Sequence, residues 1–370
     1  MVEQIKIGVV GLGNMGMTYA KALLAGRIPS AVLTAVCVNG AVKAEKARAE
    51  FGDNVQCFGD FQEFISSDEI EAVIIATPNQ THAPMATIAF QAGKHVLLEK
   101  PVSLDIREGY DLVALAESQG LTFAVMHHLR FNPQFQKLKA LLETQIIGQI
   151  QRIHWDNLRY FRPQSYYNSL SWTGTWEKDG GGLLINQAIH ELDLLNFLFG
   201  EPKSLLAYTQ FGAYRNVEVD TESTLILTYP NGASTTFVTS INEPLGQENL
   251  RIVGELGEIK WLGDGKITVT KLNQASVQAG TPEISETYDI AIRLDDNSWQ
   301  ADLIASIANF SQHILDDKQP LIAPGLAGVK SVELAKTAWA SAYLGQWLQF
   351  PVKPAEIEDS YDQIKQAYGK

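Results

Sequence analysis

The sequence predicts an α/β protein: an N-terminal doubly wound parallel sheet, followed by an α+β domain with a large, mostly antiparallel open sheet. Short β-branched runs alternate with helical stretches up to about Met126, and a glycine-rich turn follows the first run. From Leu205 to Ile292, alternating runs are separated by glycines. Because 370 residues exceed what one hydrophobic core usually organises, we expect two domains, 1–126 and 127–370.

The N-terminal part has the order of a parallel sheet with helices on both faces. Strands are predicted at Ile5–Val10, Leu33–Val38, Val73–Ala76, His95–Leu98 and Thr122–Met126. Helical periodicity is found in Met15–Ala25, Val42–Glu50, Thr81–Gln91 and Ile106–Gln119. Right-handed crossovers stack these elements into one sheet. The carboxyl ends of its strands then share one edge, where such folds bind their ligands.

The C-terminal part changes rhythm after Met126. Its predicted elements are a helix Pro133–Leu142, a polar aromatic segment His154–Trp176, a helix from the glycine triplet to Phe199, the sheet, and helices Trp299–Leu315 and Leu326–Trp347. Helices cover one face of such a sheet. We therefore expect its other face to pack on a second copy, which makes the protein a dimer or tetramer, with a covered monomer as the alternative.

Charge and composition narrow the class of protein. Forty-two acidic against 29 basic residues give a net charge of -13, which disfavours binding to nucleic acid or to anionic membranes. The N-terminus leads directly into a strand, and no window approaches the length of a membrane span, so a cytoplasmic protein is expected. Two cysteines, Cys37 and Cys57, make a disulfide framework implausible, and no metal site is predicted.

The glycine-rich turn Gly11–Gly16 follows the first strand and opens a helix. This context identifies a dinucleotide-binding, or Rossmann, motif. Gly11 permits the tight turn, Gly13 lets the backbone approach a pyrophosphate, and Gly16 allows close packing of helix and strand. The helix N-terminus attracts the anion. Gly11, Gly13, Asn14, Met15 and Gly16 are therefore predicted to bind the cofactor.

The end of the second strand bears on the choice of cofactor. NAD enzymes usually have an acidic residue there to hold the ribose 2'-hydroxyl, whereas this chain has Asn39. Lys43 follows at the start of the next helix, where it can approach a 2'-phosphate. The sequence slightly favours NADP. NAD held by Asn39 stays open, as does a solvated Lys43 without a role.

Two further strands end in polar residues at the same edge. Thr77, Pro78 and Asn79 are expected beside the nicotinamide half of the cofactor. Glu99 and Lys100 form a charged pair at the end of a buried strand, and both are predicted to contact the cofactor. A lysine partly desolvated beside a carboxylate can donate a proton to a developing alkoxide or carbonyl oxygen. Lys100 is therefore also a predicted catalytic and substrate-binding residue.

A second group of polar residues follows the triplet Gly180–Gly182. On one continuous helix, Asn186 and His190 share a face, and Asp193 can orient the histidine ring. A histidine titrating near neutral pH suits proton exchange with a hydroxyl while hydride passes to a nicotinamide. We predict that His190 and Asn186 are catalytic and bind substrate, with a core histidine as the alternative. His82 is expected to be a helix cap or surface residue.

Together these motifs resemble the glucose-fructose oxidoreductase and inositol dehydrogenase-like family. The residues that carry the resemblance are Gly11–Gly16, Glu99-Lys100-Pro101, Arg130-Phe131-Asn132-Pro133 and the block Gly180–Asp193, and it extends from Ile5 to about Trp347. The resemblance implies a Rossmann domain, an α/β domain with an open sheet, a catalytic Lys100 and an acid/base His190. Many members have aspartate where this chain has Asn186. An asparagine at this position is similar to the pattern in the sugar 3-dehydrogenase and ketoreductase branches of the family.

Substrate recognition is expected from the aromatic segment. Tyr160, Arg162, Tyr166, Trp172 and Trp176 combine flat faces with polar tips, which suits the CH and OH surfaces of a sugar, although packing is the alternative for each. The predicted function is NAD(P)-dependent hydride transfer to or from a secondary hydroxyl or ketone of a sugar, sugar derivative or cyclitol. The alternatives are a small aldehyde or ketone reductase and a catalytically silent dinucleotide-sensing regulator.

Overall fold

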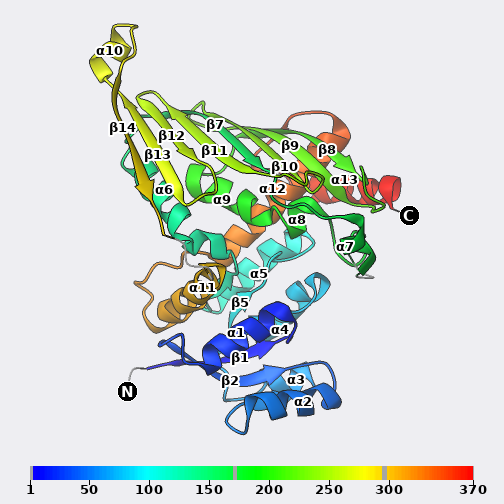
Figure 1. The fold of residues 1–370 in the computed structure, drawn as a ribbon. Helices are drawn as coiled ribbons and strands as arrows, with labels where there is room; N and C mark the ends of the chain where they lie inside the picture. Colours follow the sequence, from blue (N-terminus) through cyan, green and yellow to red (C-terminus); the bar gives the residue numbers. More distant parts are fainter. Residues whose placement is uncertain (1–2, 170–172, 294–297, 370) are drawn as a thin grey trace. The chain divides into compact units, whose positions relative to one another are not determined.

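The computed structural model describes residues 3–169, 173–293 and 298–369. Contacts within the chain divide it into two compact units. The first comprises Met1–Phe131 and Asn297–Val332, and the second comprises Asn132–Asp296 and Glu333–Lys370. Figure 1 shows the elements of each unit, which are described separately below.

The first unit contains a six-stranded parallel sheet in the order β3-β2-β1-β4-β5-β6. Its strands are β1 (Ile5–Val10), β2 (Ala31–Cys37), β3 (Gln56–Phe58), β4 (Ala72–Ile75), β5 (His95–Leu98) and β6 (Phe123–Val125). The connecting helices are α1 (Asn14–Leu24), α2 (Ala41–Phe51), α3 (Phe61–Ile65), α4 (His82–Gln91) and α5 (Ile106–Ser118). The strand order reverses between β1 and β4, which confirms the predicted doubly wound sheet and places its switch point beside the glycine turn.

The first unit also includes a helix from far along the chain. The unit also contains two short 3-10 turns, η1 (Asn79–Thr81) and η2 (His128–Phe131), and the helix α11 (Ser298–Leu315). The helix α12 (Gly325–Leu344) belongs to the first unit up to Val332 and to the second unit from Glu333. Leu303, Ile307 and Phe310 of α11 are fully buried in the core that also holds β1 and α1. This division differs from the expected 1–126 and 127–370, because the apolar face of α11 is buried against the parallel sheet.

The second unit contains a nine-stranded sheet in the order β14-β13-β12-β11-β7-β10-β9-β8-β15. Its strands are β7 (Ile150–Asn157), β8 (Ser204–Phe211), β9 (Asp220–Thr228), β10 (Ser234–Ser240), β11 (Glu248–Gly254), β12 (Gly257–Trp261), β13 (Lys266–Leu272), β14 (Ile284–Ala291) and β15 (Leu348–Gln349). Among the described residues, only β7 and β10 pair in parallel, so the predicted mostly antiparallel sheet is confirmed.

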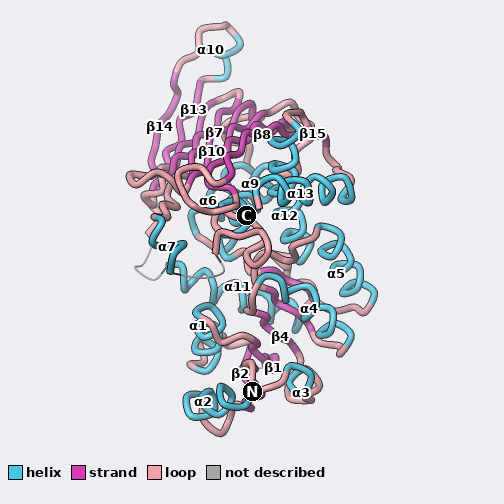
Figure 2. Tube along the Cα trace, turned by 90° about the vertical axis from the view of Figure 1, so that its right-hand side faces the viewer, coloured by secondary structure: helices cyan, strands magenta, loops and turns pink. Residues whose placement is uncertain are grey.

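Helices cover one face of this sheet. They include α6 (Pro133–Glu143), α7 (Gln164–Ser169), α8 (Leu183–Asn186), α9 (Ile189–Phe199) and α13 (Pro354–Tyr368), while α10 (Gln274–Gln278) lies in a hairpin that extends from the sheet edge (Figure 2). Phe135 of α6 packs with its ring centroid 6.2 Å from that of Trp155, which in turn meets Phe237 at 5.7 Å. These fully buried rings form the centre of the second core.

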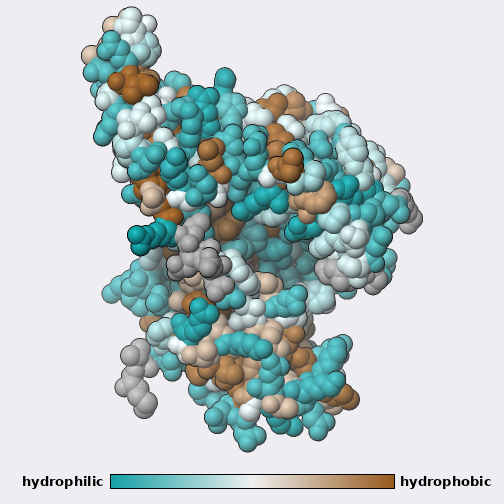
Figure 3. Space-filling model, in the orientation of Figure 1, coloured by the Kyte–Doolittle hydropathy of each residue, from teal (hydrophilic) through white to brown (hydrophobic). Residues whose placement is uncertain are grey.

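The opposite face of the sheet carries residues that are only partly buried. Tyr208 on β8 and Ile226 on β9 retain 59% and 39% of their surface, and the strand register places them on the same face. In the view of Figure 3, the second unit is largely hydrophilic with scattered apolar patches, as its acidic composition leads us to expect. Within the described part of the chain, no helix has the length and apolarity needed to cross a bilayer.

Candidate active site

The glycine turn between β1 and α1 has two glycines that the protein's own packing requires and one that it does not. Gly11 has φ +87°, and a Cβ there would lie 2.5 Å from the Ala76 carbonyl oxygen. A Cβ on Gly16 would lie 1.9 Å from the carbonyl oxygen of Gly11. At Gly13, by contrast, no atom lies within 4 Å of the Cβ position. The main chain at Gly13 therefore borders open space that a bound pyrophosphate can approach.

The N-terminus of α1 fits an anion. Its N-cap residue is Gly13, no side chain caps it, and its first turn has no acidic residue. Gly13 and Asn14 are exposed, and Met15 is half-buried. Main-chain N–H groups at such a terminus point outward with the positive end of the helix dipole, which favours phosphate. These residues fit a dinucleotide cofactor as the sequence predicts.

The end of β2 exposes the two residues that bear on cofactor choice. Asn39 lies directly before Gly40, the N-cap residue of α2, which has a φ of +95°. Lys43 is exposed in the first turn of that helix. The first turn of α2 has no acidic residue. A 2'-phosphate at this edge would therefore meet an amide and an ammonium group without a carboxylate from this turn.

At the end of β5, the Glu99 carboxylate holds the main chain of Lys100. The Lys100 N–H donates to Glu99 Oε2 at 3.1 Å, and the hydroxyl of Tyr19 on α1 donates to Oε1. Glu99 is buried and Lys100 is half-buried. Burial, and then the charge of Glu99, raise the pKa of Tyr19, so this phenol remains a donor. Sequence reasoning missed Tyr19 because its helical position resembles that of any core aromatic residue.

His82 lies inside the first unit, so its predicted cap or surface role is wrong. Only 1% of its surface is exposed. Its Nδ1 is 2.7 Å from the carbonyl oxygen of Pro101, and its Nε2 is 2.8 Å from that of Thr77. The ring thus connects the segments that follow β4 and β5. Pro78 is exposed and Asn79 half-buried at the same edge, where both were expected.

The glycine triplet of the second unit is followed by two short helices in place of the predicted single one. The helix α8 ends at Asn186, and α9 begins at Ile189. The N–H groups of Gln187 and Ala188 both donate to the Leu183 carbonyl oxygen, at 3.1 and 2.8 Å, which ends the regular helix. The prediction that Asn186 and His190 share one face of a continuous helix is therefore wrong.

Asn186 is oriented by a carboxylate that the sequence analysis did not single out. Its Nδ2 donates to Asp179 Oδ1 at 2.6 Å and to the Gly181 carbonyl oxygen at 3.0 Å. The other oxygen of Asp179 accepts the Gly174 N–H at 3.0 Å. Asp179 is buried, and its position directly before the triplet was the available signal. The Asp179 side chain therefore fixes the orientation of the asparagine amide.

Asp220 on β9 holds the start of α8. Its two carboxylate oxygens accept the N–H groups of Gly182 and Leu184, each at 2.8 Å. A Cβ on Gly182 would lie 2.3 Å from the Asp220 carbonyl oxygen, so this position requires glycine. Asp220 is fully buried, and burial raises its pKa to about 6 although the two N–H bonds oppose the shift.

His190 lies in the first turn of α9 with 9% of its surface exposed. The next residue, Glu191, is fully buried and accepts from Arg159 Nη2 at 2.7 Å and from the Tyr160 hydroxyl at 2.8 Å. Arg159 Nη1 also lies 3.0 Å from Glu248. Burial, and then the charge of Glu191, raise the pKa of Tyr160. Its hydroxyl therefore belongs to this buried network, and the Arg159 guanidinium also lies 5.3 Å from the centre of its ring.

The remaining residues of the aromatic segment have different surroundings. The Arg162 guanidinium lies 5.2 Å from the centre of the Tyr166 ring. Trp176 is buried against Phe211, Trp339 and Tyr361, so it belongs to the core and not to an exposed sugar-binding surface. Trp172 lies outside the described residues.

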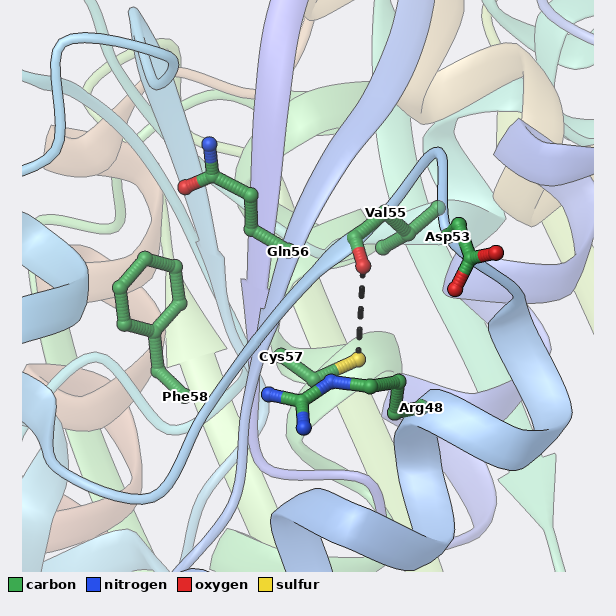
Figure 4. Close-up of a pocket in the computed structure, with 6 residues that line it drawn as sticks. All are labelled: Arg48, Asp53, Val55, Gln56, Cys57 and Phe58. Atoms are coloured by element: carbon green, nitrogen blue, oxygen red, sulfur yellow. Dashed lines mark hydrogen bonds between the residues drawn. The ribbon is translucent and has the colours of Figure 1, made fainter.

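A cavity of the first unit lies away from the predicted site. It has a volume of about 350 Å³ and is lined by Arg48, Asp53 and residues 55–58 (Figure 4). Arg48 is in the last turn of α2, whereas Asn39 and Lys43 lie at the start of that helix. Cys57 in this cavity donates to the Val55 carbonyl oxygen at 3.5 Å. This cavity therefore holds none of the predicted catalytic or cofactor residues.

Each unit thus brings together its own predicted residues. The first collects the glycine turn, Thr77–Asn79, Glu99 and Lys100 at the carboxyl edge of its sheet, and the second positions Asn186 and His190 on consecutive short helices. The pairing of Lys100 with His190 stays a prediction, since they belong to different units. A doubly wound sheet with this glycine turn, joined to an open-sheet unit, defines the class of dinucleotide-binding oxidoreductases.

Comparison with known families agrees with this class. Residues 5–127 match the model described as "Oxidoreductase family, NAD-binding Rossmann fold", and residues 135–260 match the "GFO/IDH/MocA C-terminal domain". The chain belongs to the GFO/IDH/MocA oxidoreductase family, as the resemblance of its motifs implied.

Individual relatives are distant. The uncharacterized oxidoreductase YdgJ of Escherichia coli is 31% identical over 210 residues, which cover 55% of this chain and 56% of YdgJ, so the match spans little more than half of that relative. Inositol 2-dehydrogenase 1 of Saccharopolyspora erythraea is 25% identical over 304 residues, 80% of this chain and 85% of that protein. The solved structure of levoglucosan dehydrogenase, in complex with NADH and levoglucosan, has the same fold, with a TM-score of 0.80 at 22% identity. The match covers 95% of this chain and 100% of the levoglucosan dehydrogenase chain.

The open space at Gly13 predicts the effect of a larger side chain. We expect Gly13→Val to unfold at the wild-type temperature and to bind NADH or NADPH at least about tenfold more weakly, as measured by cofactor fluorescence. Gly16→Val is the matched control, and it should lower the unfolding temperature because its side chain collides with the main chain of Gly11. Wild-type affinity in Gly13→Val would contradict the placement of the pyrophosphate.

The raised pKa of Asp220 predicts a pH-dependent contribution to stability. The folded pKa of about 6 exceeds the usual 3.8, so the folded state holds the proton more tightly, and the contribution is complete below pH 4 and lost as pH rises through 6. The free energy of unfolding of the wild type, minus that of Asp220→Asn, should fall by up to about 3 kcal/mol over this range. Urea unfolding followed by tryptophan fluorescence measures it, and a difference that is constant or rises would contradict the assignment.

Proposed function

We propose that this protein transfers hydride between a nicotinamide cofactor and a secondary hydroxyl, or the corresponding ketone, of a sugar, sugar derivative or cyclitol. The observation that carries the proposal is the attachment of the Lys100 main chain to the buried Glu99 carboxylate, at the same sheet edge as the glycine turn. The similarity to inositol 2-dehydrogenase 1 over 80% of this chain supports a polyol substrate.

The side chains then divide the work on the substrate. The bound cofactor donates or accepts the hydride. The Lys100 ammonium binds the reacting oxygen and stabilises the negative charge that develops on it. His190 takes up or returns the hydroxyl proton. Asn186, oriented by Asp179, binds a substrate hydroxyl. In this proposal Tyr160, Arg162 and Trp172 bind the rest of the sugar.

The two parts of the chain have separate roles in this proposal. Residues 1–126 bind the dinucleotide, and residues 127–370 supply the substrate side and the contact between subunits. The partly exposed face of the nine-stranded sheet, with Tyr208 and Ile226, packs against a second copy to form a dimer or tetramer. The expected cytoplasmic location rests on the sequence alone.

For the cofactor, the family binds NAD, and we propose that this chain prefers NADP. Asn39 replaces the acidic residue that would repel a 2'-phosphate, and the exposed Lys43 can attract one. Both residues lie at the end of the β2 strand and the start of α2, where the adenosine ribose binds in Rossmann folds.

The catalytic assignment predicts which variants lose turnover. On a substrate found in a panel of ketoses, pyranoses and cyclitols, Lys100→Met and His190→Asn should each lower kcat by about 10²- to 10⁴-fold, and His190→Asn should leave cofactor binding unchanged. Absorbance of the reduced nicotinamide measures both turnover and cofactor use. The exposed Lys318→Met is the matched control.

Other outcomes of the same panel are equally informative. Wild-type turnover in Lys100→Met would contradict its role. Activity confined to small aldehydes or ketones would identify a carbonyl reductase. Tight cofactor binding without turnover of any compound would identify a dinucleotide-sensing regulator.

The cofactor proposal predicts a change of preference. Asn39→Asp should raise the KM for NADPH by about tenfold or more and leave that for NADH within about threefold, because the carboxylate repels only the 2'-phosphate. Lys43→Gln should weaken NADPH binding by a smaller factor in the same direction. Initial rates with both cofactors measure the effect, and an unchanged ratio in both variants would show that neither residue meets the phosphate.

A further inference from the structure

His82 contacts the two segments that flank the predicted reaction centre of the first unit. Its Nε2 lies 2.8 Å from the Thr77 carbonyl oxygen, at the end of the segment predicted to contact the nicotinamide half. Its Nδ1 lies 2.7 Å from the carbonyl oxygen of Pro101, the residue directly after Lys100. With 1% of its surface exposed, the ring has no access to water that could replace either contact.

Both contacts require the ring to donate. A carbonyl oxygen only accepts hydrogen bonds, whereas a neutral imidazole carries one N–H and one lone pair. In either neutral tautomer, a nitrogen lone pair would face a carbonyl oxygen at hydrogen-bond distance in a buried site, which is unfavourable. The imidazolium form carries two N–H groups and satisfies both contacts.

The charges around the ring act in opposite directions. Burial is the largest influence, and on balance the pKa of His82 is lowered from its usual 6.5; the two carbonyl bonds and the Glu99 carboxylate raise it, while the Lys100 charge lowers it further. Glu99 and Lys100, both at the end of β5, are the charged groups that act on the ring. Glu99 is buried, so its attraction to an imidazolium is less screened than that of a surface carboxylate.

The main chain of Lys100 is therefore held on both sides. Glu99 accepts its N–H at 3.1 Å, and His82 binds the carbonyl group of the following residue. We propose that His82 is a positioning residue that sets the spacing between the Thr77 segment and the Lys100 turn, and that its two carbonyl acceptors hold the ring as the imidazolium against the opposing effect of burial. The part that concerns Lys100 rests on the proposed function.

The charge of the ring is tested without any substrate. In the full-length protein labelled with ¹⁵N-histidine, both His82 nitrogens should show imidazolium shifts and protected N–H signals at pH 7, assigned by their loss in His82→Gln. The chain has seven histidines, so the spectrum is simple. A neutral tautomer with a single N–H would overturn the proposal.

The positioning role is tested by a split between kinetic constants. His82→Leu should lower kcat at least about tenfold while the substrate KM and the cofactor Kd change less than about threefold. His82→Gln, whose amide nitrogen can donate two hydrogen bonds, should recover part of kcat. The matched control is His95→Leu at the opposite end of β5, where Nδ1 accepts the Thr122 N–H at 2.9 Å.

The outcomes separate this inference from the proposed function. If His82→Leu and His95→Leu lose stability alike and neither changes kcat, the role of His82 is merely structural and the proposal is wrong. If the wild type turns over nothing in the panel, the proposed function fails, and the NMR measurement still decides the charge of His82.

Discussion

Buried carboxylates that accept main-chain N–H groups hold the predicted catalytic segments in both units. Glu99 takes the N–H of Lys100 and the hydroxyl of Tyr19, so it connects the end of β5 to α1. In the second unit, Asp220 accepts hydrogen bonds from the N–H groups of Gly182 and Leu184, and Asp179 accepts one from the side-chain amide of Asn186. Charge-assisted bonds of this kind are about twice as strong as neutral ones, and they fix backbone positions that loops would otherwise leave adjustable.

These buried carboxylates also restrict the residue types and backbone conformations that the neighbouring main chain can have. The close approach of Asp220 to the main chain leaves no room for a Cβ at Gly182, which would lie 2.3 Å from the Asp220 carbonyl oxygen and 2.8 Å from its carboxylate Oδ1. Burying the charge has a cost, which the raised pKa of Asp220 reflects. Burial thus destabilises the ionised form of Asp220, while its hydrogen bonds fix the start of α8, the helix that ends at Asn186.

Much of the first unit was predictable from local pattern, since β-branched runs and helical periodicity are properties of short windows. The second unit was less so. The strand β7 was missed because the aromatic residues after it dominate its segment, and the helix from the triplet was expected to be continuous although it breaks at Gln187. That break depends on where Asp220 and Asp179 hold the chain, and both lie outside the helix itself. The burial of α11 with the first sheet depends likewise on contacts between residues far apart in sequence.

By itself, the sequence determined the doubly wound sheet, the glycine turn, and the residue types at the strand ends, because the carboxyl ends of parallel strands must share an edge. It also determined the family, through motifs that are contiguous in the chain. Only the tertiary structure decided what those side chains contact. The enclosure of His82 between Thr77 and Pro101, the commitment of the Tyr160 hydroxyl to Glu191, and the burial of Trp176 all follow from packing between distant segments, which no local pattern encodes.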